Sequence, residues 1–211
     1  MRKIEKSIEP ASLTQYKIDN PHLSYSDLAN GNESIRIDIR NSCLTEQYFL
    51  CAYCCDWIDF NYSHNEHIIP QKSIPGNDLT LDYKHNIVVS CESNKHCGHH
   101  KANKSIDLTP LMLECQNEIV YQLNGKMTHS TPRAQDAITK LNLRNKALEH
   151  KRKVIIDAVL FDYVDDLELL SIEENYFLEL IIVELTKSDN RGKLEAFSPV
   201  LINVLKQFIT T

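Results

Sequence analysis

Residues 51–70 read CAYCCDWIDFNYSHNEHIIP, and residues 85–101 read HNIVVSCESNKHCGHHK. These two stretches hold five of the seven cysteines of the 211-residue chain. Cys51 and Cys54 form a C-x-x-C pair, whose two thiolates can bind one Zn²⁺ from a tight turn. Cys91 and Cys97 supply two further thiolates from the second stretch. We therefore predict a structural zinc site made by these four cysteines.

The fourth zinc ligand has two alternatives. Five residues separate Cys91 from Cys97, which is wider than the spacing of a usual zinc knuckle. Cys55 and His96 lie close by in the sequence, and either can replace Cys97 at the zinc. The two remaining cysteines are expected to be buried thiols. No βαβ pattern surrounds the C-x-x-C pair, which disfavours thioredoxin-like redox chemistry.

The chain around these stretches predicts a mixture of strands and helices. Ile87-Val88-Val89 is a β-branched run typical of a strand. Two further runs of strand-forming residues flank Asn124-Gly125. This pattern predicts a β-hairpin whose two central residues both have positive φ. Pro10, Pro21 and short polar runs predict an extended N-terminal segment over residues 1–40.

The C-terminal third is predicted to be helical. Thr131 followed by Pro132 indicates a helix start, and the apolar stripe after it runs on towards Val159. Ser171 opens a capping box, and Ser198 precedes a proline at the start of a last helix. We therefore predict an α+β fold with an extended segment over residues 1–40, a zinc-stabilised domain over 41–130 and a helical subdomain over 131–211.

Three sequence pieces between and after the cysteine pairs resemble the HNH endonucleases. They are Glu66-His67-x-x-Pro70, Asn86-Ile87 and Cys97-x-x-x-Lys101. The family fold is a β-hairpin and a helix around one metal ion, the ββα-metal core, which cysteine pairs pin together with zinc. The resemblance implies an enzyme that hydrolyses phosphodiester bonds of DNA, with RNA not excluded as substrate.

The same resemblance implies roles for individual residues. His67 is the expected general base, because a neutral imidazole can take a proton from water near pH 7. Glu66 is an expected ligand of a catalytic Mg²⁺ or Mn²⁺, which neutralises charge on the scissile phosphate. Asn86 is expected to orient the loop that carries the base.

The chain departs from the family at the last metal ligand. The family places His or Asn directly after the second cysteine, whereas this chain has Gly98. The metal-binding role is therefore expected to pass to His99 or His100, with His99 favoured. Lys101 is expected to contact a phosphate.

A wider similarity covers most of the chain. One group of HNH nucleases resembles this chain in three further places: Met1-Arg2-Lys3-Ile4, Ser12-Leu13, and Glu46-Gln47 leading into the first cysteine pair. This group includes the PtuB-like nucleases of Septu and retron-associated antiviral defence systems. The resemblance implies a nuclease subunit that works with an ATPase partner of the PtuA kind.

Charge is distributed unevenly along the helical third. Residues 133–153 carry seven Lys or Arg against two acids, a net charge of +5, and residues 157–184 carry nine acids and no Lys or Arg. Four basic residues of the first stretch are expected to face nucleic acid: Arg144, Lys151, Arg152 and Lys153. The alternative is that the two stretches are solvated helix faces that attract each other. The acidic stretch is expected to face the ATPase, because a polyanion would repel it.

Composition limits the class of protein. Hydrophobic residues make up 42% and charged residues 25% of the chain, the ordinary mix of a folded soluble protein. No apolar run approaches the ~18 residues of a membrane span. A net charge of −6 argues against a generic nucleic-acid coat. The first ten residues lack an apolar secretory run, so we expect a cytoplasmic protein with reduced thiols.

Three other functions compete with a nuclease. His64-Asn65-Glu66 matches the H-x-E of zinc deaminases, but their C-x-x-C follows the motif, whereas here it precedes it. A Cys₂His₂ finger is disfavoured by the spacing from Cys54 to His64. The main alternative is a non-catalytic, zinc-stabilised adaptor that links an ATPase to nucleic acid, which the glycine at position 98 favours.

Overall fold

The computed structural model describes residues 1–73, 78–161 and 172–209. Its strands form two small antiparallel sheets: β1 (Ser63–His67) with β2 (Ile87–Cys91), and β3 (Ile119–Tyr121) with β4 (Met127–His129). The α-helices are α1 (Ala11–Asp19), α2 (Glu33–Glu46), α3 (Cys97–Lys101), α4 (Cys115–Glu118), α5 (Pro132–Lys140), α6 (Lys146–Phe161), α7 (Ile172–Leu185) and α8 (Ser198–Leu205). Short 3₁₀ helices are η1 (Tyr25–Ala29), η2 (Gln71–Ser73) and η3 (Asp78–Leu81). The predicted α+β class is confirmed.

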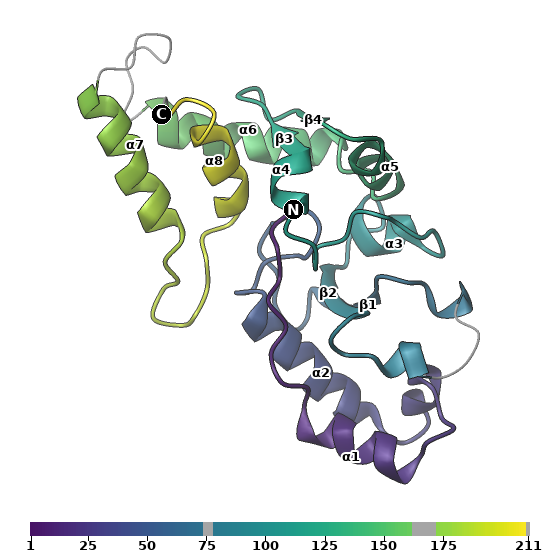
Figure 1. The fold of residues 1–211 in the computed structure, drawn as a ribbon. Helices are drawn as coiled ribbons and strands as arrows, with labels where there is room; N and C mark the ends of the chain where they lie inside the picture. Colours follow the sequence, from purple (N-terminus) through teal and green to yellow (C-terminus); the bar gives the residue numbers. More distant parts are fainter. Residues whose placement is uncertain (74–77, 162–171, 210–211) are drawn as a thin grey trace.

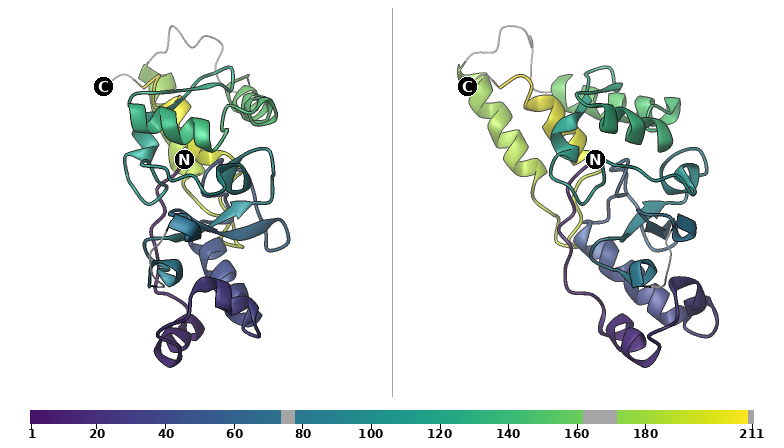
Figure 2. Two further views of the ribbon diagram at one scale, coloured as in Figure 1. Left: turned by 90° about the vertical axis from the view of Figure 1, so that its right-hand side faces the viewer. Right: turned by 45° about the vertical axis from the view of Figure 1, so that its right-hand side comes forward.

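The elements follow one another along the molecule (Figure 1). Helices α1 and α2 lie at one end, β1, β2 and α3 lie in the middle, and α5, α6 and α8 lie at the other end. Helix α7 stands at the outer edge and packs against α8, as the turned views also show (Figure 2). None of the helices in the described ranges is both long and apolar enough for a membrane span.

The β1–β2 hairpin supplies the framework of the middle layer. Its register pairs Ser63 with Cys91 and His67 with Ile87. The predicted strand is confirmed, and all three of its β-branched residues are fully buried, because α2 and α3 both pack against β2. The hairpin therefore lies inside the fold, with a long connection over residues 68–86.

The second hairpin forms where Asn124-Gly125 predicts it, but with a different turn. Gly125 has φ of 76°, whereas Asn124 is not among the residues with positive φ. Gln122 N donates to Lys126 O at 2.9 Å, so the loop has three residues with the left-handed glycine last. A side chain at Gly125 would meet Glu149 O at 2.2 Å, so α6 also requires glycine here.

The N-terminal prediction is wrong for most of residues 1–40. Helices α1 and α2 cover much of this segment, and α2 runs on past the predicted boundary. Pro10 is the N-cap of α1 and Pro21 lies just beyond its end, so the two prolines bound a helix rather than mark extended chain. Ile35, Ile39 and Cys43 repeat every four residues and form the buried face of α2.

Residues 1–10 contain no helix or strand, and one of the contacts that hold them is a buried ion pair. Lys6 and Glu46 pair with side-chain exposures of 8% and 4%. Lys6 Nζ also donates to Ile87 O at 2.9 Å, and Glu46 Oε2 accepts from Ser7 N at 2.9 Å and from Tyr83 Oη at 2.9 Å. The pair therefore joins the N-terminal segment, α2 and β2.

The C-terminal third is helical as predicted, with one break. Thr131 Oγ1 accepts from Ala134 N at 3.3 Å, which confirms the predicted N-cap of α5. The predicted stripe does not form one helix, because the chain turns at Asn142, which has φ of 48°, before α6 begins. The capping box at Ser171 lies outside the described residues. Helix α8 begins at Ser198 as predicted.

We expect Lys6→Met to lower the free energy of unfolding by about 3–5 kcal/mol, because it leaves the Glu46 carboxylate buried without its cation. The matched control is Lys17→Met, which removes the partner of Glu9 from a pair with side-chain exposures of 36% and 17%. Such an exposed pair contributes less than about 1 kcal/mol. Urea unfolding of both variants measures the difference, and equal losses would contradict the role given to Lys6.

Candidate functional site

The structure brings the four predicted cysteines together. One sulfur from each of Cys51, Cys54, Cys91 and Cys97 lies within 4.8 Å of every other, and none is in a disulfide. In a tetrahedral zinc site with Zn–S bonds of ~2.3 Å, the sulfurs lie about 3.8 Å apart. The donor set and its spacing therefore fit a metal ion such as zinc.

Local backbone geometry positions these sulfurs. Cys55 has φ of 64° and its N–H donates to Cys51 O at 3.1 Å, which closes the tight turn of the C-x-x-C pair. Cys91 N donates to Cys51 Sγ at 3.4 Å. Cys97 has φ of 62°, and its N–H donates to Leu141 O at 2.8 Å, so the end of α5 holds the start of α3.

The alternative zinc ligands lie outside the four-sulfur cluster. Cys55 is buried elsewhere in the core, and burial raises its pKa. His96 Nδ1 lies 3.1 Å from Cys97 Sγ and 3.8 Å from Cys91 Sγ, which places its ring beside the cluster as a hydrogen-bond partner. Cys97 itself supplies the fourth sulfur.

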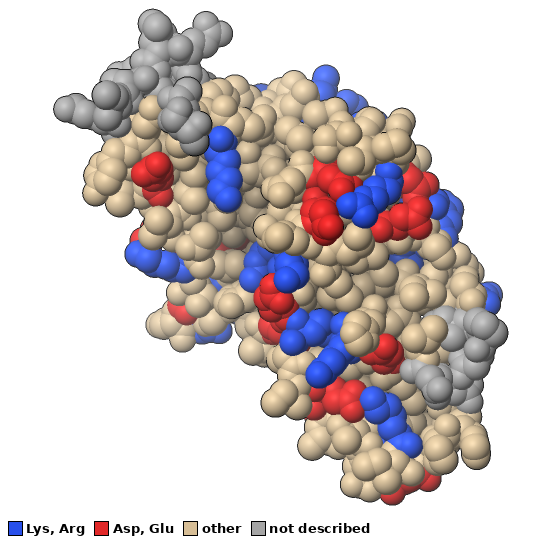
Figure 3. Space-filling model, in the orientation of Figure 1, with Lys and Arg blue, Asp and Glu red and all other residues tan. Residues whose placement is uncertain are grey.

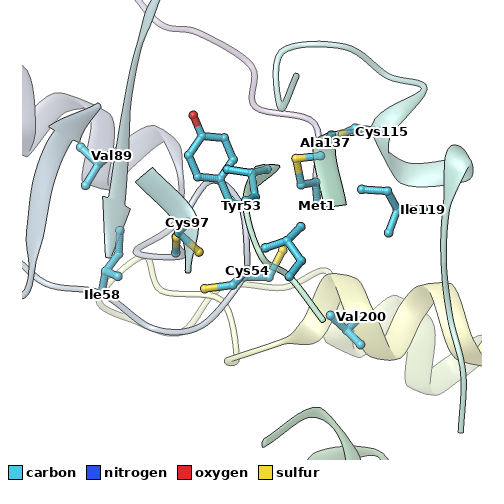
Figure 4. Packing of buried hydrophobic residues seen from close by; sticks show 14 of the residues in the cluster. Met1, Tyr53, Cys54, Ile58, Val89, Cys97, Cys115, Ile119, Ala137 and Val200 are labelled. Carbon is cyan, nitrogen blue, oxygen red and sulfur yellow. The ribbon is translucent and has the colours of Figure 1, made fainter. Parts of the chain in front are cut away.

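The remaining thiols are buried, as expected. Burial raises the pKa of Cys43 to about 12 and that of Cys115 to about 11, which makes both unreactive. Figure 4 shows Cys54, Cys97 and Cys115 among apolar side chains such as Met1. The four-cysteine cluster is thus part of the main core.

The four sulfurs differ in their electrostatic surroundings. Hydrogen bonds from Cys51 and Cys54 lower the pKa of Cys91, whereas burial raises the pKa of Cys97. Four thiolates at this distance repel one another, so a divalent cation is needed for all four to be ionised together.

We expect Cys54→Ala to lose the bound zinc and to unfold or melt at a much lower temperature, since zinc binding at such a site is also folding free energy. Cys115→Ala is the matched control: it truncates another buried cysteine, one outside the cluster. Elemental analysis and thermal melts should show one zinc per chain in the wild type and in the control. Equal zinc contents in the two variants would contradict this assignment.

A buried carboxylate lies on β1. Glu66 Oε1 lies 3.0 Å from Lys101 Nζ and accepts from Tyr53 Oη at 3.2 Å, and Glu66 Oε2 lies 3.6 Å from His64 Nε2. Burial acts to raise the pKa of Glu66, but the neighbouring His64 and the charge of Lys101 outweigh it and hold the pKa below its usual value. Glu66 is therefore an anion in a largely buried position.

Lys101 does not lie where a phosphate contact was expected. Its side chain is 1% exposed, and its ammonium donates to His67 O at 2.9 Å besides pairing with Glu66. Because α3 packs against β2, the last residue of this helix is directed into the protein. Lys101 is therefore an internal partner of the carboxylate and not a surface cation.

His67 follows Glu66 on the strand and has a defined tautomer. Its Nε2 lies 2.9 Å from Thr80 O, and a carbonyl can only accept, so Nε2 carries the proton. Its Nδ1 faces Gln71 Nε2 at 3.3 Å and keeps a lone pair. Burial lowers the pKa of His67, which keeps the ring neutral at pH 7.

Asn86 closes the connection between the two strands. Its Oδ1 accepts from Ile69 N at 2.7 Å and its Nδ2 donates to Leu79 O at 2.9 Å. Leu79 precedes Thr80, whose carbonyl holds His67. The buried amide of Asn86 thus fixes the loop that orients the imidazole.

A surface pocket of about 500 Å³ gives access to these groups. Glu66 and His67 both line it, together with Gln71, Lys72 and Asn103. Lys72 is exposed and supplies a cation at the pocket that the sequence did not single out. An anion, a neutral imidazole and a cation therefore meet at one opening.

The two candidate histidines of α3 point to different neighbours. His99 Nε2 lies 2.7 Å from Glu92 Oε2, and its ring centroid lies 4.2 Å from that of His64. His64, Glu92 and His99 together can hold a metal ion. His100 instead places Nδ1 3.0 Å from Lys140 O, at the end of α5. The sequence analysis missed Glu92 and used His64 only as part of the H-x-E pattern.

Arg152 does not face nucleic acid. Its side chain is 1% exposed, and it donates to Gly125 O at 2.8 Å and to Leu143 O at 3.1 Å. The guanidinium therefore ties α6 to the β3–β4 turn, which is a structural role that its place in a basic run does not indicate.

The other basic residues of this run have protein partners. Lys151 Nζ lies 2.6 Å from Asp56 Oδ2, Lys153 pairs with Asp157, and Arg144 Nε donates to Met127 O at 3.3 Å. On the face shown in Figure 3, basic and acidic side chains alternate. The sequence run therefore overstates the positive charge available to a polyanion.

No protein-family model matches the chain, and no curated protein sequence matches it. The functional conclusion therefore depends on the geometry of the site described above.

Proposed function

We propose that the chain is a metal-dependent endonuclease of the HNH type that hydrolyses phosphodiester bonds of DNA. One observation supports this most strongly: Glu66 and His67, adjacent on β1, line the same pocket as an anion and a neutral imidazole. In this proposal β1, β2 and α3 are the ββα-metal core, and the four-cysteine cluster is its structural zinc site.

His67 acts as the general base in the proposed reaction. Its Nδ1 accepts from Gln71 Nε2 at 3.3 Å, and both residues line the pocket. In the reaction the attacking water takes the place of the Gln71 amide and gives its proton to this lone pair. The Thr80 carbonyl holds Nε2–H and stabilises the imidazolium that results. Asn86 is a positioning residue, since it acts through the loop that carries this carbonyl.

Glu66 is the proposed protein ligand of a divalent cation, Mg²⁺ or Mn²⁺. Carboxylate oxygen suits both ions, and the low pKa of Glu66 keeps it charged. When bound, the cation supplies neutralisation of the scissile phosphate and of the leaving oxygen. Lys101 holds the carboxylate in place from inside the protein.

We expect His67→Ala to lower the rate of DNA cleavage by about 10²–10⁴-fold, the usual effect of removing a general base. His85→Ala is the matched control, because that histidine lies on the surface with its side chain 80% exposed. Plasmid cleavage with Mg²⁺ or Mn²⁺, and RNA in a parallel reaction, measures both rate and substrate class. Cleavage by the His67 variant at the wild-type rate would rule out this base; binding of DNA without cleavage by any form would favour the adaptor function.

Lys72 takes the phosphate-binding role that was assigned to Lys101. We expect Lys72→Ala to weaken DNA binding and to reduce the salt slope of log Kd by about 1, the contribution of one phosphate contact. Lys84→Ala, at another exposed lysine that does not line the pocket, should leave the slope unchanged. Identical salt titrations for the two variants would contradict a contact at Lys72.

We further propose that the nuclease works with an ATPase subunit of the PtuA kind in antiviral defence. Tyr176, Leu180 and Val183 are exposed and fall on one face of α7 by their spacing, which suits a protein surface better than a nucleic acid. Residues 162–171 of the acidic stretch lie outside the described residues. Co-purification of the ATPase with wild type and Leu180→Asp tests this surface.

A further inference from the structure

We propose that the divalent cation is held between Glu66 Oε2 and His64 Nε2, and that Gly98 keeps the space for it. In this arrangement His99, the ligand expected from the sequence, does not bind the cation directly. The cation is that of the proposed nuclease, so this inference rests on the proposed function, but the ligands follow from three independent observations on β1, β2 and α3.

The first observation is the direction of the two side chains. His64 and Glu66 are two residues apart on β1 and therefore share one face of the strand. Their facing atoms, Nε2 and Oε2, lie 3.6 Å apart. Two neighbouring ligands of an octahedral ion with bonds of ~2.1 Å lie about 3.0 Å apart. A small rotamer adjustment therefore brings both atoms into the coordination sphere of one ion.

The second observation concerns the carboxylate behind His64. Glu92 Oε1 lies 3.4 Å from His64 Nδ1, and Nδ1 has no hydrogen-bond partner among the described residues. A small rotation of Glu92 therefore lets its carboxylate accept from Nδ1 when Nε2 binds a cation. A carboxylate behind a metal-binding histidine is the usual way in which a protein fixes its tautomer. The competing arrangement is His64 placed between Glu66 and Glu92 with no metal.

The third observation is the absence of a side chain at position 98. A Cβ there would lie 2.7 Å from His64 Nε2 and 2.8 Å from Glu66 Oε2. A side chain at this position points at the place between the two ligands, so a residue larger than glycine would have to displace the ends of His64 and Glu66. The imidazole thus comes from β1 instead of from the start of α3.

His99 has a supporting place in this arrangement. Its Nε2 lies 2.7 Å from Glu92 Oε2, and its side chain is 44% exposed. It holds the Glu92 carboxylate that lies beside His64 Nδ1. The rival cation position, among His64, Glu92 and His99, would make His99 a direct ligand.

Mn²⁺ binding to the zinc-loaded full chain, measured by EPR and calorimetry without DNA, tests the ligands. We expect His64→Ala and Glu66→Ala each to weaken Mn²⁺ binding at least 10-fold, and His99→Ala to change it less than about 3-fold. His64→Asn keeps a polar group of similar width and serves if the alanine variant does not fold; it should also lose at least 10-fold. Unchanged binding in a folded His64 variant overturns the proposal, as does a His99 variant that loses binding while the Glu66 variant keeps it.

A ligand exchange gives a second test. Gly98→His alone should weaken Mn²⁺ binding, because the new side chain meets His64. His64→Ala combined with Gly98→His should bind Mn²⁺ at least 10-fold more tightly than His64→Ala alone, because the imidazole now reaches the same space from α3. Binding no tighter than that of the single variant, with zinc content and circular dichroism intact, counts against this place for the ion.

The two proposals can fail separately. A chain that binds Mn²⁺ through His64 and Glu66 but cleaves no nucleic acid keeps the ligand assignment and overturns the nuclease function. A chain that cleaves DNA equally well with and without His64, at unchanged Mn²⁺ affinity, keeps the nuclease and overturns the ligand assignment.

Discussion

Four sulfur atoms from three separate segments meet within 4.8 Å of one another in the middle of this protein. They join the turn before β1, the end of β2 and the first residue of α3. A two-stranded hairpin is at best marginally stable alone, and a helix of five residues cannot persist by itself. A metal ion at this cluster would make one unit of three pieces that are each too small to be stable, and α5 adds the hydrogen bond from Cys97 to Leu141.

The candidate site depends on this unit because its buried charges are paired across two elements of the unit. Glu66 comes from β1 and Lys101 from the end of α3, so their 3.0 Å contact exists only while the helix is held on the hairpin. An unpaired charge in that position would cost several kcal/mol. Stability and site geometry are therefore coupled: a loss at the cysteine cluster would also release Lys101 from Glu66.

A second buried pair performs a similar task farther away. Lys6 and Glu46 connect the N-terminal segment to α2, and Lys6 also reaches the carbonyl of Ile87 at the start of β2. The strand that faces the site is thus held from one side by the cysteine cluster and from the other by this pair. Asn86 directly precedes the same strand, and its side chain hydrogen-bonds the backbone of Ile69 and Leu79. It therefore fixes the loop around His67 to this strand.

Local patterns in the sequence were enough to predict the cysteine cluster, a strand over residues 87–89, the β3–β4 hairpin and the helical end of the chain, because spacing and turn residues act over a few positions. The resemblance to the HNH endonucleases, rather than a local pattern, singled out Glu66, His67 and Asn86. Local patterns did not reveal that Lys101 and Arg152 are buried, since exposure of a long cationic side chain depends on which elements pack over it. The contacts of His64 with Glu66 and Glu92 depend on strand pairing and on the missing side chain at Gly98. A local sequence pattern does not contain these contacts, because they join residues that are brought together only by the fold.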